Sequence, residues 1–553
     1  MKKKSNKKEK VVKEEVKKTK PIVVQKKIEL KAFLILLGIM MLVSFALFMG
    51  TISLMQDDAD YILDAHNLVN NGAFPGTHGT YLYHFVLSIF NYMFGISITV
   101  TKVLAFIWAI IGFYFTYKIL QKVTNRFLSI AILFIYATNF GILFYSSSTM
   151  SESFFMMIQA IFIYLFINKY DLILSEVNKS NVVKYASSLL LFIVVLFLLS
   201  ITKGIGIIAT FSLVLFLLIH KKWLNAIVIG GIFGVFKFAF DTSMKAIFNL
   251  DALSNRSATI WLKNYYDTKQ GTEDIEGMIR RIFINFDFHI SADLMRILGF
   301  RDNKFLEPVT FLTVLFFILF VVGLVYTFKN RKKLFYIGLY LSMMMGVTFL
   351  VLQTHWKQDR MIIVFIPFIL LFIFESYNYW LRKKESFHIR LFNAAVVILC
   401  LVNLRHLPDK IDENNKPLQN YLSGEVFQNY ERDWQNYLLA VDWASENLPE
   451  GSVVACRKPN SAMVYSKNGI QFVGLYRSTQ LPGDEVLKEL KELGVTHILQ
   501  AQIRLNPAQY VPGRFIGTVH TYVRSISNYN PSKLKVLKKI GNLEEAYVLE
   551  IVD

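Results

Sequence analysis

The chain has 553 residues, of which 54% are hydrophobic and 48 are phenylalanine, and its formal net charge is +19. The apolar residues gather in long blocks, which excludes an ordinary soluble protein. The basic charge does not indicate nucleic-acid binding, because Lys and Arg cluster in residues 1–31 and in short loops between the apolar blocks. The two cysteines, Cys400 and Cys456, indicate neither a disulfide framework nor a cysteine metal site.

Segment 1–31 is rich in Lys and Glu and low in complexity, which predicts a disordered basic tail on the cytoplasmic side. Eleven apolar blocks follow, most of them about as long as the roughly 17–25 residues with which a helix crosses a bilayer. They lie at about 32–53, 97–117, 127–146, 152–168, 185–201, 204–219, 223–248, 306–328, 334–353, 361–380 and 388–406. The sequence therefore predicts a polytopic α-helical membrane protein.

A twelfth block, 81–95, is shorter and is interrupted by polar residues. If it does not cross, the basic loops that contain Lys118, Lys221, Lys329 and Arg382 all face the cytoplasm, as the positive-inside rule requires. If it crosses, all of these loops move outside. We therefore expect 81–95 to be an interfacial or re-entrant helix.

This topology gives a transmembrane domain over 32–406, with a first outer loop at 54–96 and a long outer loop at 249–305. From about 410 to 553 the chain becomes polar, and its pattern predicts an extracytoplasmic α/β domain. The expected helices are 434–447 and 484–493, and the expected strands are 452–456, 470–475, 495–500 and 546–552.

Acidic residues occur at two places on the predicted outer face. Asp57, Asp58 and Asp60 follow the first block, and Glu152 opens a later one. Neighbouring carboxylates repel one another unless a cation or a hydrogen-bond donor offsets them. Both groups also suit the first turn of a helix, so a structural role stays open for each.

Basic residues occur at the same predicted depth. Lys203 stands between two blocks with almost no loop around it, and His355, Lys357 and Arg360 form a charged turn before another block. A Lys at this depth can extend its ammonium to water, but it can also bind a phosphate. The planar guanidinium of Arg360 suits a phosphate as well as a structural ion pair.

These groups come from separate loops, yet the charge rule places all of them on one side of the membrane. Ionisable groups at membrane depth are costly and mostly functional. The set predicts a site that holds a lipid-linked phosphate and activates a nucleophile by general base catalysis. In the long outer loop, Asp287, His289 and Asp293 have a spacing that could ligate a metal, but they match no defined motif, and a structural or acceptor-binding role is favoured.

The order of these motifs resembles the polyprenyl-phosphate-sugar glycosyltransferases of the GT-C fold, which include protein O-mannosyltransferases and the lipid A aminoarabinose transferase. Their first outer loop begins with an Asp-Glu pair; Asp57 falls on the Asp, and Asp58 replaces the Glu. Tyr61 falls where the aminoarabinose branch often has Tyr, and Glu152 matches a second acidic position. One departure is His78-Gly79-Thr80-Tyr81, which lacks two prolines of the family's run.

The resemblance also covers the Lys203-Gly204 turn, the Asp359-Arg360 pair and the extracytoplasmic α/β domain of bacterial members. It implies a sugar donor on a polyprenyl phosphate and an acceptor hydroxyl that attacks with inversion while Asp57 takes the proton. Lys203 and Arg360 would then stabilise the leaving phosphate.

The charged turn makes His355 and Lys357 candidates for substrate binding, and the resemblance adds Tyr61 to them. Asp58 and Glu152 are catalytic candidates beside Asp57. Some relatives bind a divalent metal at the acidic residues, here Asp57 and Glu152. The expected partners are the lipid-linked donor, membrane lipids and an unknown extracytoplasmic acceptor. Three alternatives stay open: an O-antigen ligase or polymerase, a transporter or flippase of lipid-linked sugars, and an inactive membrane scaffold.

Overall fold

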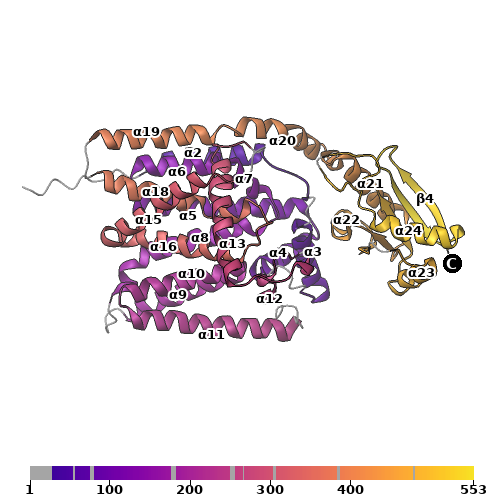
Figure 1. The fold of residues 1–553 in the computed structure, drawn as a ribbon, viewed down its shortest axis with the longest axis horizontal. Helices are drawn as coiled ribbons and strands as arrows, with labels where there is room; N and C mark the ends of the chain where they lie inside the picture. The colour runs from indigo at the N-terminus through magenta and orange to yellow at the C-terminus, as the bar shows by residue number, and fades with distance from the viewer. Residues whose placement is uncertain are drawn as a thin grey trace, which may run out of the picture.

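The computed structural model of the chain describes residues 28–53, 57–74, 80–175, 182–248, 256–265, 267–302, 307–382, 386–477, 480–507 and 509–552. Most of the predicted basic tail, 1–27, lies outside the described residues, as does His78. The first described helix, α2, begins at Leu30. Figure 1 shows a bundle of roughly aligned helices with a separate α/β domain beyond one of its ends.

Each of the eleven predicted blocks coincides with apolar helical structure. Among the described residues, seven helices are long and apolar enough to cross a membrane, an eighth candidate is a pair bent by 52°, and three further apolar helices are shorter. The seven are α5 (Ile98–Val123), α8 (Ser151–Leu174), α9 (Val182–Thr202), α11 (Trp223–Phe248), α15 (Thr310–Asn330), α16 (Lys332–Val351) and the stretch Ser386–Leu422, which begins with α19 (Ser386–Asn403). The bent pair is α6 (Arg126–Thr138) with α7 (Phe140–Phe144) and η1 (Tyr145–Ser147). The shorter ones are α2 (Leu30–Ala46), η2 with α10 (Gly204–Gly206 and Ile207–Ile219) and α18 (Ile366–Leu381).

The basic loops meet at one end of this bundle, which we call the proximal end. Arg331 Nη2 donates to the carbonyl oxygen of Val123 over 2.9 Å, and Lys333 Nζ lies 3.5 Å from a carboxylate oxygen of Asp171. Thr124 Oγ1 donates to buried Glu375 over 2.5 Å. The loops that the charge rule assigns to one side of the membrane therefore do lie together.

The opposite, distal end carries α3 (Asp57–Asn71), α4 (Tyr81–Phe94) and the C-terminal domain. Helix α4 packs on α3, and Asn91 Nδ2 donates to the carbonyl oxygen of Ile62 over 2.9 Å. Its other face exposes apolar side chains, among them Ile89 and Tyr92. Helix α4 is not among the candidate spans of the described residues, and its packing on α3 agrees with the expectation of an interfacial helix.

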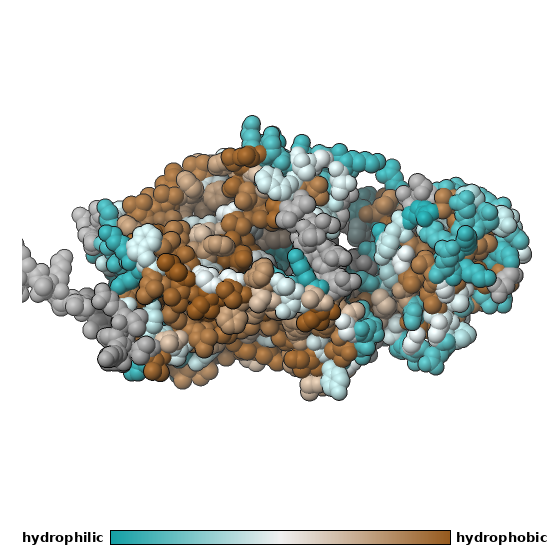
Figure 2. Space-filling view, turned by 90° about the horizontal axis from the view of Figure 1, so that it is seen from below, coloured by the Kyte–Doolittle hydropathy of each residue, from teal (hydrophilic) through white to brown (hydrophobic). Residues whose placement is uncertain are grey.

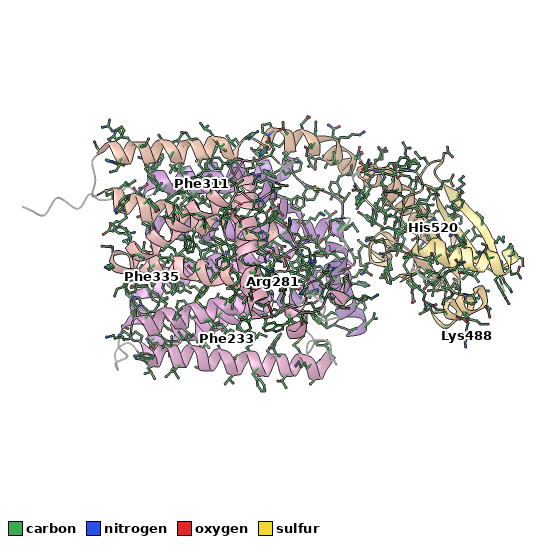
Figure 3. The ribbon with its side chains drawn as sticks, viewed as in Figure 1. Phe233, Arg281, Phe311, Phe335, Lys488 and His520 are labelled. Carbon is green, nitrogen blue, oxygen red and sulfur yellow. The ribbon has the colours of Figure 1, made fainter. Side chains whose placement is uncertain are left out.

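The segment predicted as a long outer loop is largely helical. It contains α12 (Arg256–Trp261), η4 (Thr268–Gln270), α13 (Ile275–Asp287), the π-helix η5 (Phe288–Leu294) and α14 (Met295–Ile297). Helix α13 packs on α16, and Arg281 lies inside the bundle (Figure 3). Arg281 donates to the carbonyl oxygens of Ile260 and Leu262, so the buried guanidinium ties this segment to α13.

After α19, helix α20 (Leu407–Leu422) leads away from the bundle to the C-terminal domain (Figure 1). The domain consists of η6 (Val426–Asn429), α21 (Arg432–Asn447), β1 (Val453–Cys456), α22 (Pro459–Tyr465), β2 (Gln471–Gly474), α23 (Gly483–Glu492), β3 (His497–Ala501), α24 (Thr518–Tyr529), η7 (Pro531–Lys533), β4 (Leu534–Ile540) and β5 (Ala546–Ile551).

The five strands form one sheet in the order β2-β1-β3-β5-β4. Strand β1 is parallel to β2 and β3, whereas β5 is antiparallel to β3 and β4. Helices α21 and α22 cover one face of the sheet, and α23 and α24 cover the other. Figure 2 shows apolar side chains over much of the bundle and mostly hydrophilic ones over this domain.

Three elements of the domain are absent from the sequence expectation: α22, α24 and β4. Pro459 resembles a break in the pattern, but it occupies the first turn of α22, where proline is tolerated. The seven-residue strand β4, which includes Lys535, Lys538 and Lys539, suits the edge of the sheet, because lysines at an edge deter pairing with another chain.

The sidedness of the two ends is testable with an impermeant thiol reagent on intact cells. Lys467→Cys in the C-terminal domain should be labelled from outside, and Lys329→Cys at the proximal end should be labelled only after the membrane is opened. The unmodified chain is the control, since Cys456 is buried and Cys400 lies in α19. Labelling of Lys329→Cys in intact cells would reverse the assigned topology.

Candidate functional site

The first turn of α3 carries the acidic cluster, because carboxylates are stabilised at the positive end of a helix. The carboxylates of this cluster have different partners. Asp58 is buried and accepts hydrogen bonds from Ser53 N and Ser53 Oγ over 2.7 and 2.8 Å. Burial raises the pKa of Asp58, while the Lys102 ammonium and the Ser53 donors act in the opposite direction. Asp58 thus ties α3 to the preceding loop.

Asp57 faces away from that loop and pairs with Arg360. Arg360 Nη1 donates to Asp57 Oδ2 over 2.6 Å, and the two side chains are 25% and 28% exposed. Burial opposes the charge of Arg360, but Glu152 and Asp57 outweigh it and raise its pKa. The guanidinium therefore stays charged and still has donors that Asp57 does not use.

Glu152 lies at the start of α8, where it pairs with Lys203 from the turn between α9 and η2. Lys203 Nζ donates to Glu152 Oε1 over 2.6 Å. Glu152 is 2% exposed, and within the described part of the chain its Oε2 accepts no hydrogen bond. Tyr61 is buried close by, and burial followed by the charge of Glu152 raises the pKa of its hydroxyl.

A cavity of about 680 Å³ opens beside the Asp57–Arg360 pair. One part of its wall is apolar and comes from α7 and the ends of neighbouring segments: Leu47, Met49, Phe140, Phe144 and Met150. The other part is charged and carries as many carboxylates as basic groups: Asp57, Asp293, Asp359, Glu413, Arg296, Lys357, Arg360 and Lys410. An amphiphile whose charged headgroup contacts the basic side chains can use both parts of this wall.

The cavity includes charged residues that sequence reasoning did not single out as ligands. Arg296 Nη2 donates to Asp359 Oδ2 over 3.2 Å, and it lies 3.5 Å from Asp293 Oδ1. Tyr145 OH also donates to Asp359, over 3.2 Å. The sequence did contain a signal for Arg296: it follows Asp293 by three residues, a spacing that places both side chains on one face of a helix.

The structure brings some predicted residues together and separates others. Asp57, Lys357 and Arg360 line the cavity, whereas Asp58, Tyr61, Glu152, Lys203 and His355 do not. His355 packs against Trp356, and burial followed by the Arg281 charge lowers its pKa. Lys357 lies 5.0 Å from the ring centre of Phe288.

The three long-loop residues also separate. Asp287 accepts hydrogen bonds from Thr310 and Thr313, over 2.9 and 2.5 Å. His289 Nδ1 lies 2.7 Å from Asp293 Oδ2. They therefore do not converge on one ligand.

A divalent metal at Asp57 and Glu152 would compete with basic side chains for these carboxylates. Each carboxylate already faces a cation, Arg360 for Asp57 and Lys203 for Glu152. The described ranges contain no group of three or more His, Cys, Asp or Glu residues that could hold a metal ion. A metal at this position would have to displace both basic side chains.

The C-terminal domain holds the loop before α3. Tyr430 OH donates to the carbonyl oxygen of Ile52 over 3.1 Å, and Ile52 N donates to Tyr465 OH over 3.4 Å. The two hydroxyls lie 2.7 Å apart. Burial raises the pKa of Tyr465 to about 12, so its hydroxyl stays protonated near neutrality. On α3 itself, Asp60 Oδ1 accepts a hydrogen bond from Asn460 Nδ2 over 2.6 Å.

No protein-family model matches the chain, and no curated protein sequence is similar to it. Among solved structures, ArnT from Cupriavidus metallidurans bound to undecaprenyl phosphate has 10% identity and a TM-score of 0.54, and the match covers 94% of this chain and 98% of that one. The oligosaccharyltransferase AglB from Archaeoglobus fulgidus, in complex with an inhibitory peptide and a dolichol-phosphate, has 12% identity and a TM-score of 0.46, with 85% and 69% covered. Its apo form has a TM-score of 0.48. The likeness to ArnT confirms the GT-C fold that the order of motifs predicts.

The tyrosine pair gives a test of how the C-terminal domain supports the site. Tyr465→Phe removes the acceptor for Ile52 N and the contact with Tyr430, so amide hydrogen exchange over 52–63 should become at least several-fold faster. Tyr529→Phe is the matched control, because Tyr529 is 58% exposed at the far side of the same domain. Unchanged exchange in Tyr465→Phe would mean that the hydroxyl pair does not hold α3.

Proposed function

We propose that this protein is a membrane glycosyltransferase that moves a sugar from a polyprenyl-phosphate donor to an extracytoplasmic acceptor, with inversion. One observation carries the proposal: the cavity joins an apolar wall to a charged wall on which Arg296, Lys357 and Arg360 lie beside Asp57 and other carboxylates. Its volume lies within the roughly 300–1,000 Å³ typical of small-molecule sites. Since a fold does not by itself imply a function, the argument rests on this site.

The charged wall suits the donor phosphate. Arg296, Lys357 and Arg360 line the same cavity, and the apolar residues Phe140 and Phe144 offer a surface for the first isoprene units. The known neighbour of the same fold, ArnT, is bound to undecaprenyl phosphate, a ligand of this chemistry. When the donor is bound, its phosphate gives Arg360 a second anionic partner beside Asp57.

In the proposed reaction, the acceptor hydroxyl attacks the anomeric carbon from the face opposite the phosphate. The new bond joins the acceptor oxygen to that carbon, and the bond between the carbon and the phosphate oxygen breaks. Asp57 takes the proton of the hydroxyl. The polyprenyl phosphate leaves with the electron pair, and Arg360 and Arg296 stabilise the charge that develops on it.

The remaining acidic residues act around this centre. Asp58 fixes the start of α3 through Ser53, and Glu152 with Lys203 forms a second buried ion pair next to Tyr61. The charge of Glu152 acts on Arg360 together with that of Asp57. Glu152 and Lys203 thus set the charge balance of the site from just outside the cavity.

Replacing the proposed base tests this mechanism. Asp57→Asn keeps the side-chain shape but cannot accept the proton as a carboxylate does, so transfer of radiolabelled sugar from polyprenyl-phosphate donors to native membrane extract should fall by about 10²–10⁴-fold. Asp484→Asn, at an exposed position in the first turn of α23, is the matched control. Equal transfer by a folded Asp57→Asn variant would place the chemistry elsewhere.

Metal dependence is a separate test. Because Asp57 and Glu152 are paired with basic side chains, transfer by the wild-type protein should persist in EDTA with less than about a two-fold change. The measurement is the same transfer assay, run with EDTA and then with added Mg²⁺ or Mn²⁺. A loss that either metal restores would show that the carboxylates exchange their basic partners for a metal ion.

A further inference from the structure

The C-terminal sheet has a topological feature at which α/β domains commonly bind ligands. From β1 the chain passes through α22 to β2 on one side, and then through α23 to β3 on the other side of β1. Helices α22 and α23 cover opposite faces of the sheet. In open α/β sheets, ligands bind beyond the carboxyl ends of parallel strands at such a reversal point.

Two basic residues lie at the carboxyl end of β1, where Arg457 and Lys458 directly follow the strand. Both are half-buried, and no carboxylate of the described residues lies within 4.0 Å of either basic group. Arg457 stacks over the Tyr476 ring at 5.0 Å, while its Nε is buried without a hydrogen bond. Lys458 Nζ lies 5.9 Å from the Trp434 ring centre.

Adjacent cations that are partly buried and unpaired carry a cost that an anionic ligand would offset. The structure shows this cost at Lys458, where burial and then the charge of Arg457 lower the pKa, and the Asp60 carboxylate counteracts them only in part. Lys467 in the same domain is different, because it pairs with Asp442 and Glu446 over 2.9 and 3.2 Å. Lys467 thus has the carboxylate partners that Arg457 and Lys458 lack among the described residues.

The basic pair faces the candidate active site. Asn460 of α22 donates to Asp60 of α3, two residues after Lys458 in the chain. Asp60 lies about one helical turn, or about 5 Å, from Asp57 along α3. The pair after β1 therefore lies close to the first turn of α3, whose Asp60 acts on the charge of Lys458.

We propose that Arg457 and Lys458 bind an anionic group of the acceptor, a phosphate or a carboxylate, and so direct the acceptor hydroxyl toward Asp57. The acceptor role rests on the proposed function, whereas the anion site rests on the geometry of the C-terminal domain. The two cations act by binding, and Asp57 remains the base. The C-terminal domain thereby helps to select the acceptor as well as to hold α3.

The anion site can be tested one residue at a time on the full-length protein in nanodiscs. Acylation of individual lysines by an N-hydroxysuccinimide ester is followed by peptide mass spectrometry, with inorganic phosphate as the probe and chloride at equal ionic strength as the reference. Phosphate should slow the acylation of Lys458 at least three-fold and leave Lys467 unchanged. In Arg457→Gln this protection should disappear.

An unchanged rate at Lys458, or equal protection in Arg457→Gln, would overturn the anion site. The source of the anion is read by comparing nanodiscs of phosphatidylcholine with nanodiscs that also contain phosphatidic acid. If Lys458 is protected without added phosphate in nanodiscs that contain phosphatidic acid, the anion is a lipid headgroup. Protection by inorganic phosphate in the first kind identifies a water-soluble group, and both results support the site.

The acceptor role is decided by the transfer assay with titrated membrane extract. Lys458→Gln and Arg457→Gln should each raise the apparent KM for the acceptor at least three-fold and leave kcat within about two-fold. Lys467→Gln should change neither constant. Transfer with an unchanged KM would overturn the acceptor role, whereas protection of Lys458 in a protein without any transfer would keep the anion site and reject the proposed function.

Discussion

The ion pair between Asp57 and Arg360 is the contact on which the distal end of the bundle depends. It joins two residues that are 303 positions apart in the chain, over 2.6 Å. Because both groups are largely removed from water, either one alone would leave a poorly solvated charge beside the cavity. The pair fixes the carboxylate and the guanidinium at one wall of the same cavity, where a proton acceptor and an anion-binding group are both needed.

The surrounding structure keeps this pair in place from two directions. Inside the bundle, Glu152 and Lys203 add a second buried ion pair whose charge reaches Arg360. Outside it, the hydroxyls of Tyr430 and Tyr465 hold Ile52, a few residues before α3. The C-terminal domain is therefore part of the framework of the site, and its basic residues after β1 lie on the side that faces α3.

Much of the fold could be predicted from the sequence, because membrane crossing leaves strong one-dimensional signals. The length of the apolar blocks predicted the membrane helices. The positions of Lys and Arg in the loops predicted that 81–95 lies at the membrane interface. The sequence also singled out Asp57, Lys357 and Arg360 as rare charges at predicted membrane depth, and these three line the observed cavity, while their roles stay proposals. The partners could not be predicted: that Arg360 pairs with Asp57, or that Arg296 joins the cavity, depends on contacts between distant segments. Helix α22 was not predicted, because a proline such as Pro459 indicates a loop as often as the first turn of a helix when the packing around it is unknown.

The most direct test of the account is an experimental structure of the full-length protein with undecaprenyl phosphate bound. The account predicts that the phosphate lies within hydrogen-bonding distance of Arg360 and within reach of Arg296, with the first isoprene units against Phe140 and Phe144. Asp57 would then share Arg360 with the phosphate and face the acceptor. A phosphate bound at the proximal end, or away from the cavity that Asp57 and Arg360 line, would contradict the account.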